Sequence, residues 1–230
     1  VVPRGVRVHD DATGHGRESA PVGLSWTGPG NADGRSRTVF AHPHVGSTMP
    51  RVVSFGSVNV DHVGYHPRDR IEDLADAYDW FPGAGETVRV DSVPATVRDD
   101  LTETFLGGKG ANQAVAAAAA GADTRLLGCV GEDEDEHAVV ETLAKRGVAV
   151  DGLERVDDPT GYAAIVVDDE SVENHIAIVA GANGRVTPDY AHRHGDRLRA
   201  ADCLLLQNEL PAEAALAALD EVAGVDGRPV

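Results

Sequence analysis

The sequence predicts an α/β protein with a doubly wound, mainly parallel sheet. Three apolar runs have the character of buried strands, at residues 51–58, 124–130 and 202–207. Helix-prone stretches of about 10–14 residues alternate with them, as in parallel strands joined by crossover helices. Hydrophobic residues make up 42% of the 230-residue chain, which is ample for a large domain with its own core.

Polar side chains follow the first predicted strand. This strand spans residues 51–58 and leads into Asn59-Val60-Asp61. Ligands of α/β sheets gather at the carboxyl ends of strands, so Asn59 and Asp61 are candidate binding residues. Both residue types also form turns readily, and an Asx-type turn is the alternative interpretation.

A glycine-rich stretch, residues 107–112, opens the most helix-prone run in the chain, residues 113–120. Free N–H groups at a helix N-terminus favour oxygen-rich ligands, and glycine lets a ligand approach the backbone closely. Lys109 adds a charged donor, and Asn112 can both donate and accept, which suits a polyhydroxyl ligand. The nucleotide P-loop requires Ser or Thr where Gly110 stands, and the dinucleotide motif requires glycine in place of Asn112. A tight turn with a solvated lysine is the alternative.

The remaining segments predict further helices and a second, smaller sheet. Four helices are expected, at residues 70–80, 137–146, from Thr187-Pro188 onward, and 212–223. Two β-rich segments joined by an acidic turn predict a hairpin, at residues 162–167 and 175–179. Together with residues 86–93 and 103–106, this hairpin predicts a small sheet apart from the main one.

Two other features have ordinary structural interpretations. The acidic run at residues 132–136 precedes a predicted helix, where acids complement the helix dipole, and we favour this over a metal site. Cys129 and Cys203 each lie in an apolar run and are interpreted as buried strand thiols in a reducing compartment. No stretch approaches the roughly 18 apolar residues of a membrane span and no secretory signal is visible, so we expect a cytoplasmic protein.

The chain is strongly acidic, with a formal net charge of −18 and only two lysines, Lys109 and Lys145. Such a surface repels nucleic acid and anionic membranes, so neither is an expected partner. Strong negative charge with scarce lysine also indicates adaptation to a salt-rich cytoplasm, where screening reduces self-repulsion. This hypothesis predicts loss of the fold at low salt.

Residues 1–48 differ in character from the rest. They are rich in Gly, Arg, His, Ser and Pro and show no sustained strand or helix period. Met49 is the only methionine, and the first strand begins two residues later. We expect residues 1–48 to be a disordered extension or a start-site error, and residues 49–230 to be the domain.

Six motifs follow one another along the domain. They are residues 56–61 (GSVNVD), 85–87 (GET), 107–114 (GGKGANQA, with Gly121 and Gly131 after it), 160–161 (TG), 180–183 (AGAN) and 207–211 (QNELP). The series resembles the ribokinase-like (PfkB) carbohydrate kinases, and within that family the motifs are most similar to those of ribokinases. The resemblance covers residues 51–230.

The resemblance implies ATP-dependent phosphorylation of a sugar hydroxyl, with ribose as the leading candidate. ATP and Mg²⁺ are the implied cofactors, and a K⁺ requirement stays open. The implied substrate-binding residues are Asn59, Asp61, Gly108, Lys109, Asn112 and Glu209. A carboxylate only accepts hydrogen bonds, so Asp61 can take two adjacent hydroxyl protons.

The β-rich pieces near residues 82–106 and 160–183 resemble the family's lid, which closes over the sugar, excludes water and contributes to a homodimer. The family's catalytic aspartate lies in a Gly-Ala-Gly-Asp motif of the nucleotide-binding half, and the 230 residues contain no such motif. The expectation is a sugar-binding half of a kinase, with the C-terminal half absent. Catalytic, cofactor and metal residues are then expected beyond residue 230, so the chain alone is inactive and prone to aggregate.

Two alternatives stay open. A nucleoside kinase or another sugar kinase of the same family shares the diol that Asp61 would bind. A non-catalytic sugar-binding module is the alternative from a different class. A purely structural domain leaves the clustered polar residues unexplained.

Overall fold

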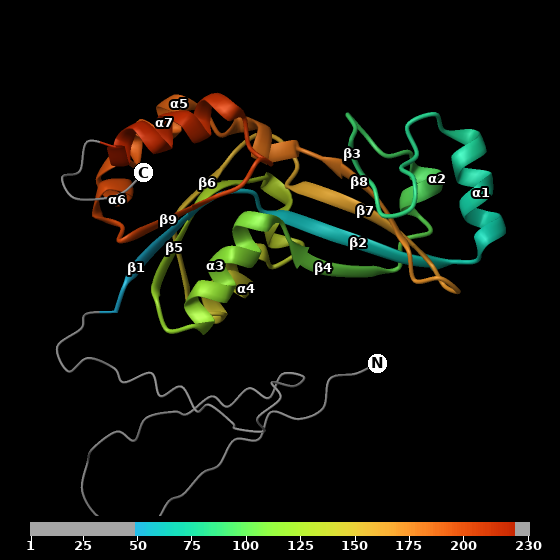
Figure 1. Cartoon of the computed structure of the whole chain (residues 1–230), viewed down its shortest axis with the longest axis horizontal. Coiled ribbons are helices and arrows are strands. Elements are labelled where there is room, and N and C mark those ends of the chain that lie inside the picture. The colour runs from blue at the N-terminus through green and yellow to red at the C-terminus, as the bar shows by residue number, and fades with distance from the viewer. Residues whose placement is uncertain (1–48, 224–230) are drawn as a thin grey trace, which may run out of the picture. The chain divides into compact units, whose positions relative to one another are not determined.

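The computed structural model describes residues 49–223, which form two β-sheets with helices packed against them (Figure 1). The first sheet has four strands in the order β6-β5-β1-β9, and every neighbouring pair is parallel. Its strands are β1 (Arg51–Phe55), β5 (Asp123–Val130), β6 (Val148–Arg155) and β9 (Cys203–Leu206). The predicted doubly wound parallel sheet is therefore confirmed.

Helices cover both faces of the first sheet (Figure 1). On one face, Ala114 and Leu143 pack against Leu126. On the other face, the Tyr190 ring lies 5.9 Å from the Phe55 ring. The helices are α3 (Lys109–Ala119) and α4 (Val139–Lys145) on the first face, and α5 (Pro188–Arg193), α6 (Gly195–Ala200) and α7 (Ala212–Ala223) on the second.

The second sheet has five strands in the order β3-β8-β7-β2-β4. The predicted hairpin is present as the antiparallel pair β7–β8, and β2 pairs parallel to β7. Two helices cover one face, where Ile71, Leu74 and Val97 pack against Ala164 and Val166. The elements are β2 (Asn59–His66), β3 (Thr87–Arg89), β4 (Glu103–Gly107), β7 (Gly161–Asp168), β8 (Asn174–Val179), α1 (Arg68–Ala77) and α2 (Ala95–Arg98).

The structure differs from the prediction in where the first strand ends. The prediction continued this strand to residue 58 and treated residues 62–106 as polar and irregular, with a short helix at residues 70–80. In the structure β1 ends at Phe55, and a new strand, β2, begins at Asn59 and runs to His66. Asn59 and Asp61 therefore belong to the second sheet, where they follow the carboxyl end of β1 without being part of it. The polar residues within β2 obscured its strand pattern.

Strand β6 and helices α2 and α6 were not predicted either. Strand β6 was not recognised in the sequence because Asp151 and Glu154 interrupt its apolar pattern, although its partner β5 was predicted. Helix α6 follows α5 after a single residue, His194, so the two short helices resemble one longer helix in the sequence.

The acidic run and one cysteine also differ from expectation. Within the short helix η1 (Glu132–Asp135), Glu134 is buried and pairs with Arg155, and Asp133 accepts a hydrogen bond from Thr160 N at 2.8 Å. These acids therefore anchor neighbouring segments, and α4 begins only at residue 139. Cys129 is buried as predicted, but Cys203 is exposed, because β9 is an edge strand of the described sheet.

The predicted extension at residues 1–48 lies outside the described residues, and so do residues 224–230. The prediction for the extension therefore stays a prediction. Between residues 49 and 223, none of the helices combines the length and apolar character needed to cross a membrane.

Candidate functional site

The loop after β1 packs directly on the start of α3. A Cβ atom added to Gly56 would lie 2.6 Å from Gly110 Cα, so neither position has room for a side chain. Ser54 Oγ donates to Gly110 O at 2.8 Å, and Ala111 N donates to Ser57 O at 3.0 Å. The two glycines thus bring the carboxyl end of β1 into backbone contact with the N-terminus of α3.

Glu209, in the loop between β9 and α7, joins these segments. One carboxylate oxygen accepts from Ser57 Oγ at 2.5 Å and from Lys109 N at 3.3 Å, and the other pairs with Lys109 Nζ. The Glu209 side chain is 9% exposed, whereas that of Lys109 is 57% exposed. Burial alone raises the pKa of Glu209, but the hydrogen bonds from Lys109 and Ser57 outweigh it, so this pKa lies below its ordinary value.

Asp61 is partly buried in β2, beside the end of β4. A Cβ atom at Gly107 would lie 2.0–2.2 Å from the carboxylate atoms of Asp61, so only glycine at that position leaves room for them. Burial, and then the charge of Glu209, raise the pKa of Asp61 to about 6, while Lys109 acts in the opposite direction. The site therefore holds two carboxyl groups whose pKa values are shifted in opposite directions.

Gly108 makes the turn from β4 into α3. Its φ of 89° is a conformation that other residues rarely adopt, and a Cβ atom there would lie 2.8 Å from Asn59 N. Asn59 itself is buried, and its Oδ1 accepts a hydrogen bond from Asn183 Nδ2 at 2.8 Å. The glycine thus places Lys109, the first residue of α3, close to the start of β2.

Asn112 lies in the first turn of α3, where its backbone N–H donates to Gly108 O at 2.9 Å. Its side chain is exposed and forms no hydrogen bond with another described residue. Among the other predicted site residues, Lys109 contacts Glu209 directly and Gly108 lies against Asn59. Asp61 is linked to Lys109 and Glu209 through their charges, and Asn112 lies at the edge of the cluster.

Two further residues of the cluster were not named among the predicted site residues. Ser57 donates to Glu209, and Asn183, in the short helix η2 (Gly181–Arg185), contacts both Asn59 and the Val58 backbone. Both belong to motifs of the resemblance, so the sequence marked their positions. Their role depends on contacts between residues 125 and 152 positions apart, which periodicity does not reveal.

The cluster can bind several hydroxyl groups at once. Asp61 supplies acceptors, Lys109 and the N-terminus of α3 supply donors, and Asn59 carries an amide. In the part of the chain that the structure describes, no three side chains of His, Cys, Asp or Glu form a group suited to a metal. The donors and acceptors of the cluster are of the kinds that form hydrogen bonds with an oxygen-rich molecule.

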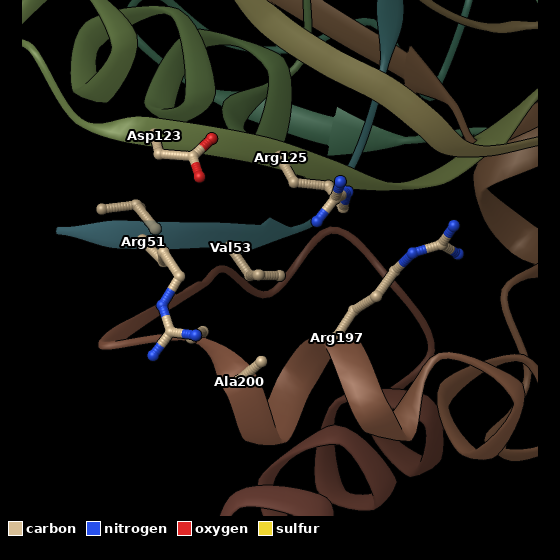
Figure 2. A pocket seen from close by; sticks show the side chains of 8 residues that line it. Arg51, Val53, Asp123, Arg125, Arg197 and Ala200 are labelled. Carbon is tan, nitrogen blue, oxygen red and sulfur yellow. The ribbon is translucent and has the colours of Figure 1, made fainter. Parts of the chain in front are cut away.

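A pocket lies at the opposite end of the first sheet, between the amino ends of β1 and β5 and helix α6 (Figure 2). Arg51, Arg125 and Arg197 line it. Arg125 Nε and Arg197 Nη2 each lie 2.9 Å from the Asp151 carboxylate, and Arg51 pairs with Asp202 at 3.1 Å. All three guanidinium groups are thus already paired with carboxylates.

Comparisons with known proteins identify the family of the chain. The sequence pattern of the pfkB family carbohydrate kinases matches residues 49–227. Ribokinase of Bacillus subtilis is 39% identical over 141 residues, which are 61% of this chain and 45% of that protein. Ribokinase of Schizosaccharomyces pombe is 34% identical over 175 residues, or 74% of this chain and 49% of that protein.

A solved structure of Arabidopsis thaliana ribokinase complexed with ribose and ATP superimposes with a TM-score of 0.56 at 29% identity. The match covers 76% of this chain and 50% of that chain. The chain spans about half the length of the curated relatives it matches. Because the family pattern extends from the first described strand to beyond α7, this chain belongs to the pfkB family of carbohydrate kinases.

Proposed function

We propose that this chain forms the sugar-binding part of an enzyme that phosphorylates a sugar hydroxyl with ATP, and that the sugar is ribose. The observation that carries the proposal is the cluster of Asp61, Lys109 and Glu209 at the carboxyl end of the first sheet. Open α/β sheets bind their ligands at this end. The similar ribokinases of Bacillus subtilis and Schizosaccharomyces pombe support ribose as the substrate.

The six residues expected to bind the sugar keep that role in the proposal. Asp61 accepts from two hydroxyls, Lys109 donates to a sugar oxygen, and Asn112 reaches the sugar from the first turn of α3. Glu209 is engaged by Lys109 and Ser57 in the structure, so its first effect is to hold the Lys109 ammonium in place. The remaining two, Asn59 and Gly108, complete the wall between β2 and α3.

ATP is the proposed phosphoryl donor, in line with the ribose and ATP complex of Arabidopsis thaliana ribokinase. Mg²⁺ is the proposed cofactor. A K⁺ requirement is a further proposal, and activity in KCl compared with NaCl would test it.

The second sheet is the proposed lid. Side chains alternate along a strand, so Asp61 and Tyr65 of β2 lie on one face, together with Phe105, which pairs with Asp61 across the ladder. Tyr65 and Phe105 are 57% and 53% exposed on this face. We expect two copies to associate through these aromatic residues. In sedimentation experiments we expect the unaltered chain to be a dimer and Phe105→Asp to be a monomer. An unaltered chain that sediments as a monomer would contradict the proposed interface.

Calorimetric titration of D-ribose into the 230-residue chain tests the sugar site directly. In concentrated KCl we expect saturable binding with one site per chain, and weaker binding of adenosine. Tighter binding of adenosine would instead favour a nucleoside as substrate. Absence of binding by either ligand to a chain that unfolds cooperatively would overturn the proposed function.

A further inference from the structure

Asn183 is held in one orientation by the backbone of the β1–β2 loop. It is 2% exposed and lies in η2, far from β2 in the sequence. Its Oδ1 accepts from Val58 N at 2.9 Å, and its Nδ2 donates to Val58 O at 3.1 Å. A backbone N–H only donates and a carbonyl only accepts, so exchanging the amide oxygen and nitrogen would break both bonds.

This fixed orientation determines which atom of Asn59 faces Asn183. The same Nδ2 also donates to Asn59 Oδ1 at 2.8 Å. Because Nδ2 has no lone pair to offer, the atom of Asn59 that faces it must be the oxygen. The Asn59 NH₂ group is then directed away from Asn183, and it forms no hydrogen bond with any other residue between 49 and 223.

Because residue 161 is glycine, there is room for the contact between the Asn183 and Asn59 side chains. A Cβ atom at that position would lie 2.1 Å from Asn183 Nδ2 and 2.7 Å from Asn59 Oδ1. Such distances are shorter than any that real Cβ atoms adopt, so a side chain at residue 161 would displace the two amides. The two short motifs at residues 160–161 and 180–183 therefore act on the same feature, the Asn59 side chain.

We infer that Asn183 is a positioning residue that makes Asn59 a hydrogen-bond donor to the ligand. The inference rests on the proposed function, because it needs a hydroxyl oxygen to receive the bond. Asn59 and Asp61 stand two residues apart on one face of β2 and so present a donor beside an acceptor. A hydroxyl group can accept from the first and donate to the second, which selects a hydroxylated ligand over one with only acceptors or only donors.

Two shape-conserving variants of the full chain test the inference by ribose titration. Asn59→Asp keeps an oxygen for Asn183 but removes the donor. Asn183→Asp keeps the acceptor for Val58 N, loses the donor to Val58 O, and turns an oxygen toward Asn59, whose amide then rotates to donate to it. We expect each change to weaken ribose binding by at least about fivefold, because each removes the hydrogen bond that Asn59 donates to the ligand. Unchanged ribose affinity in Asn59→Asp would overturn the inference.

A double variant separates positioning from a general structural effect. Asn59→Ala removes the side chain that Asn183 orients, so adding Asn183→Asp should cause no further loss of ribose affinity. Losses that multiply in the double variant would show that Asn183 acts through the fold and would overturn the inference. The thermal midpoints of all variants show whether each one is folded.

Nuclear magnetic resonance of the ligand-free chain distinguishes failure of this inference from failure of the proposed function. The Asn59 side-chain NH₂ should exchange rapidly with water in the unaltered chain and become protected in Asn183→Asp. If this occurs but ribose does not bind, the assignment of ribose is wrong and the orientation stands. An Asn59 NH₂ that is protected in the unaltered chain would refute the orientation itself.

Discussion

Both ends of the first sheet carry paired charges, but the two ends differ in how far those charges are buried. At the carboxyl end, Glu209 is 9% exposed and pairs with Lys109, while Asp61 lies partly buried nearby. At the amino end, Arg125 and Asp151 form their pair with side chains 36% and 55% exposed. Water reaches every charge of the second group, but only part of the first.

This difference in burial decides what the charges can do. Exposed pairs gain little because water screens them and long side chains lose freedom when they are held. A carboxyl group held among glycines and a buried partner keeps a shifted pKa and stays available to a ligand. The carboxyl end therefore has the properties of a binding site, whereas the amino end ties β5, β6 and α6 together.

Of the substitutions at the two ends of the sheet, loss of Asp61 should have the largest effect on ribose affinity. A hydrogen bond to a charged group is worth about 1.5–3 kcal/mol, so Asp61→Ala should weaken ribose binding roughly 10- to 150-fold. The matched change at the other end, Asp151→Ala, should leave ribose affinity unchanged. Titration of both variants checks the pair of expectations, and equal affinity of Asp61→Ala and the unaltered chain would remove Asp61 from the site.

The pH dependence of ribose binding should follow the ionisation of the Asp61 carboxyl group. The pKa of Asp61 is raised to about 6, chiefly by burial, and only the ionised form accepts from two hydroxyls. Ribose affinity should therefore be constant well above pH 6 and fall below it, approaching about tenfold per pH unit. Titrations across this range measure the effect, and a flat profile would contradict the raised pKa.

The two carboxyl groups should also affect stability with opposite dependence on pH. The folded chain binds the Asp61 proton more tightly than the unfolded chain, so the Asp61 contribution to the free energy of unfolding falls as pH rises from 3.8 to about 6. Glu209 has a lowered pKa, so its contribution is present above 4.5 and is lost as pH falls through the lower folded value.

Lys109 and Lys145 offer a matched pair of substitutions with an intermediate effect. Lys109→Met leaves Glu209 buried without its cation, which should lower the free energy of unfolding by about 1–3 kcal/mol. Lys145 pairs with Glu141 on the exposed surface of α4, so Lys145→Met should cost less than about 0.5 kcal/mol. Urea unfolding of the two variants measures the difference, and equal losses would mean that burial of Glu209 has little energetic effect.

Lys109 should also influence the pH at which ribose affinity falls. Its charge lowers the pKa of Asp61, so Lys109→Met should move the fall in ribose affinity to a higher pH than in the unaltered chain. Lys145→Met should not move it. A profile that is unchanged in both variants would indicate that Lys109 does not influence Asp61.

Local signals in the sequence account for much of the fold. Residues 212–223 were predicted as a helix and form α7 with the same bounds. Thr187 was predicted as an N-cap, and its Oγ1 accepts from Tyr190 N at 3.2 Å. Each of these rests on propensities, periods and caps that act within a few residues, which a sequence shows directly.

The rest depends on contacts between distant segments. In strand β2, Asp61 belongs to the polar cluster and His62 packs beside Tyr162. These two polar residues obscure the strand period of β2 in the sequence. Ser57 and Asn183 acquire their roles through contacts 152 and 125 residues apart. Family resemblance supplied the site residues that the residue pattern alone left open, but not the orientation that Asn183 imposes on Asn59.

The smallest effect is expected at the amino end. Arg125→Met leaves Asp151 still paired with Arg197 at 2.9 Å and accessible to water, so the free energy of unfolding should fall by less than about 1 kcal/mol. The hydrogen bond from Arg125 is the main reason that the pKa of Asp151 is lowered, so this pKa should return toward its ordinary value. Because salt screens exposed pairs, the loss of stability should shrink further as KCl is raised. Thermal unfolding at several KCl concentrations measures it. A loss as large as that of Lys109→Met, or any change in ribose affinity, would show that the amino end is coupled to the binding site.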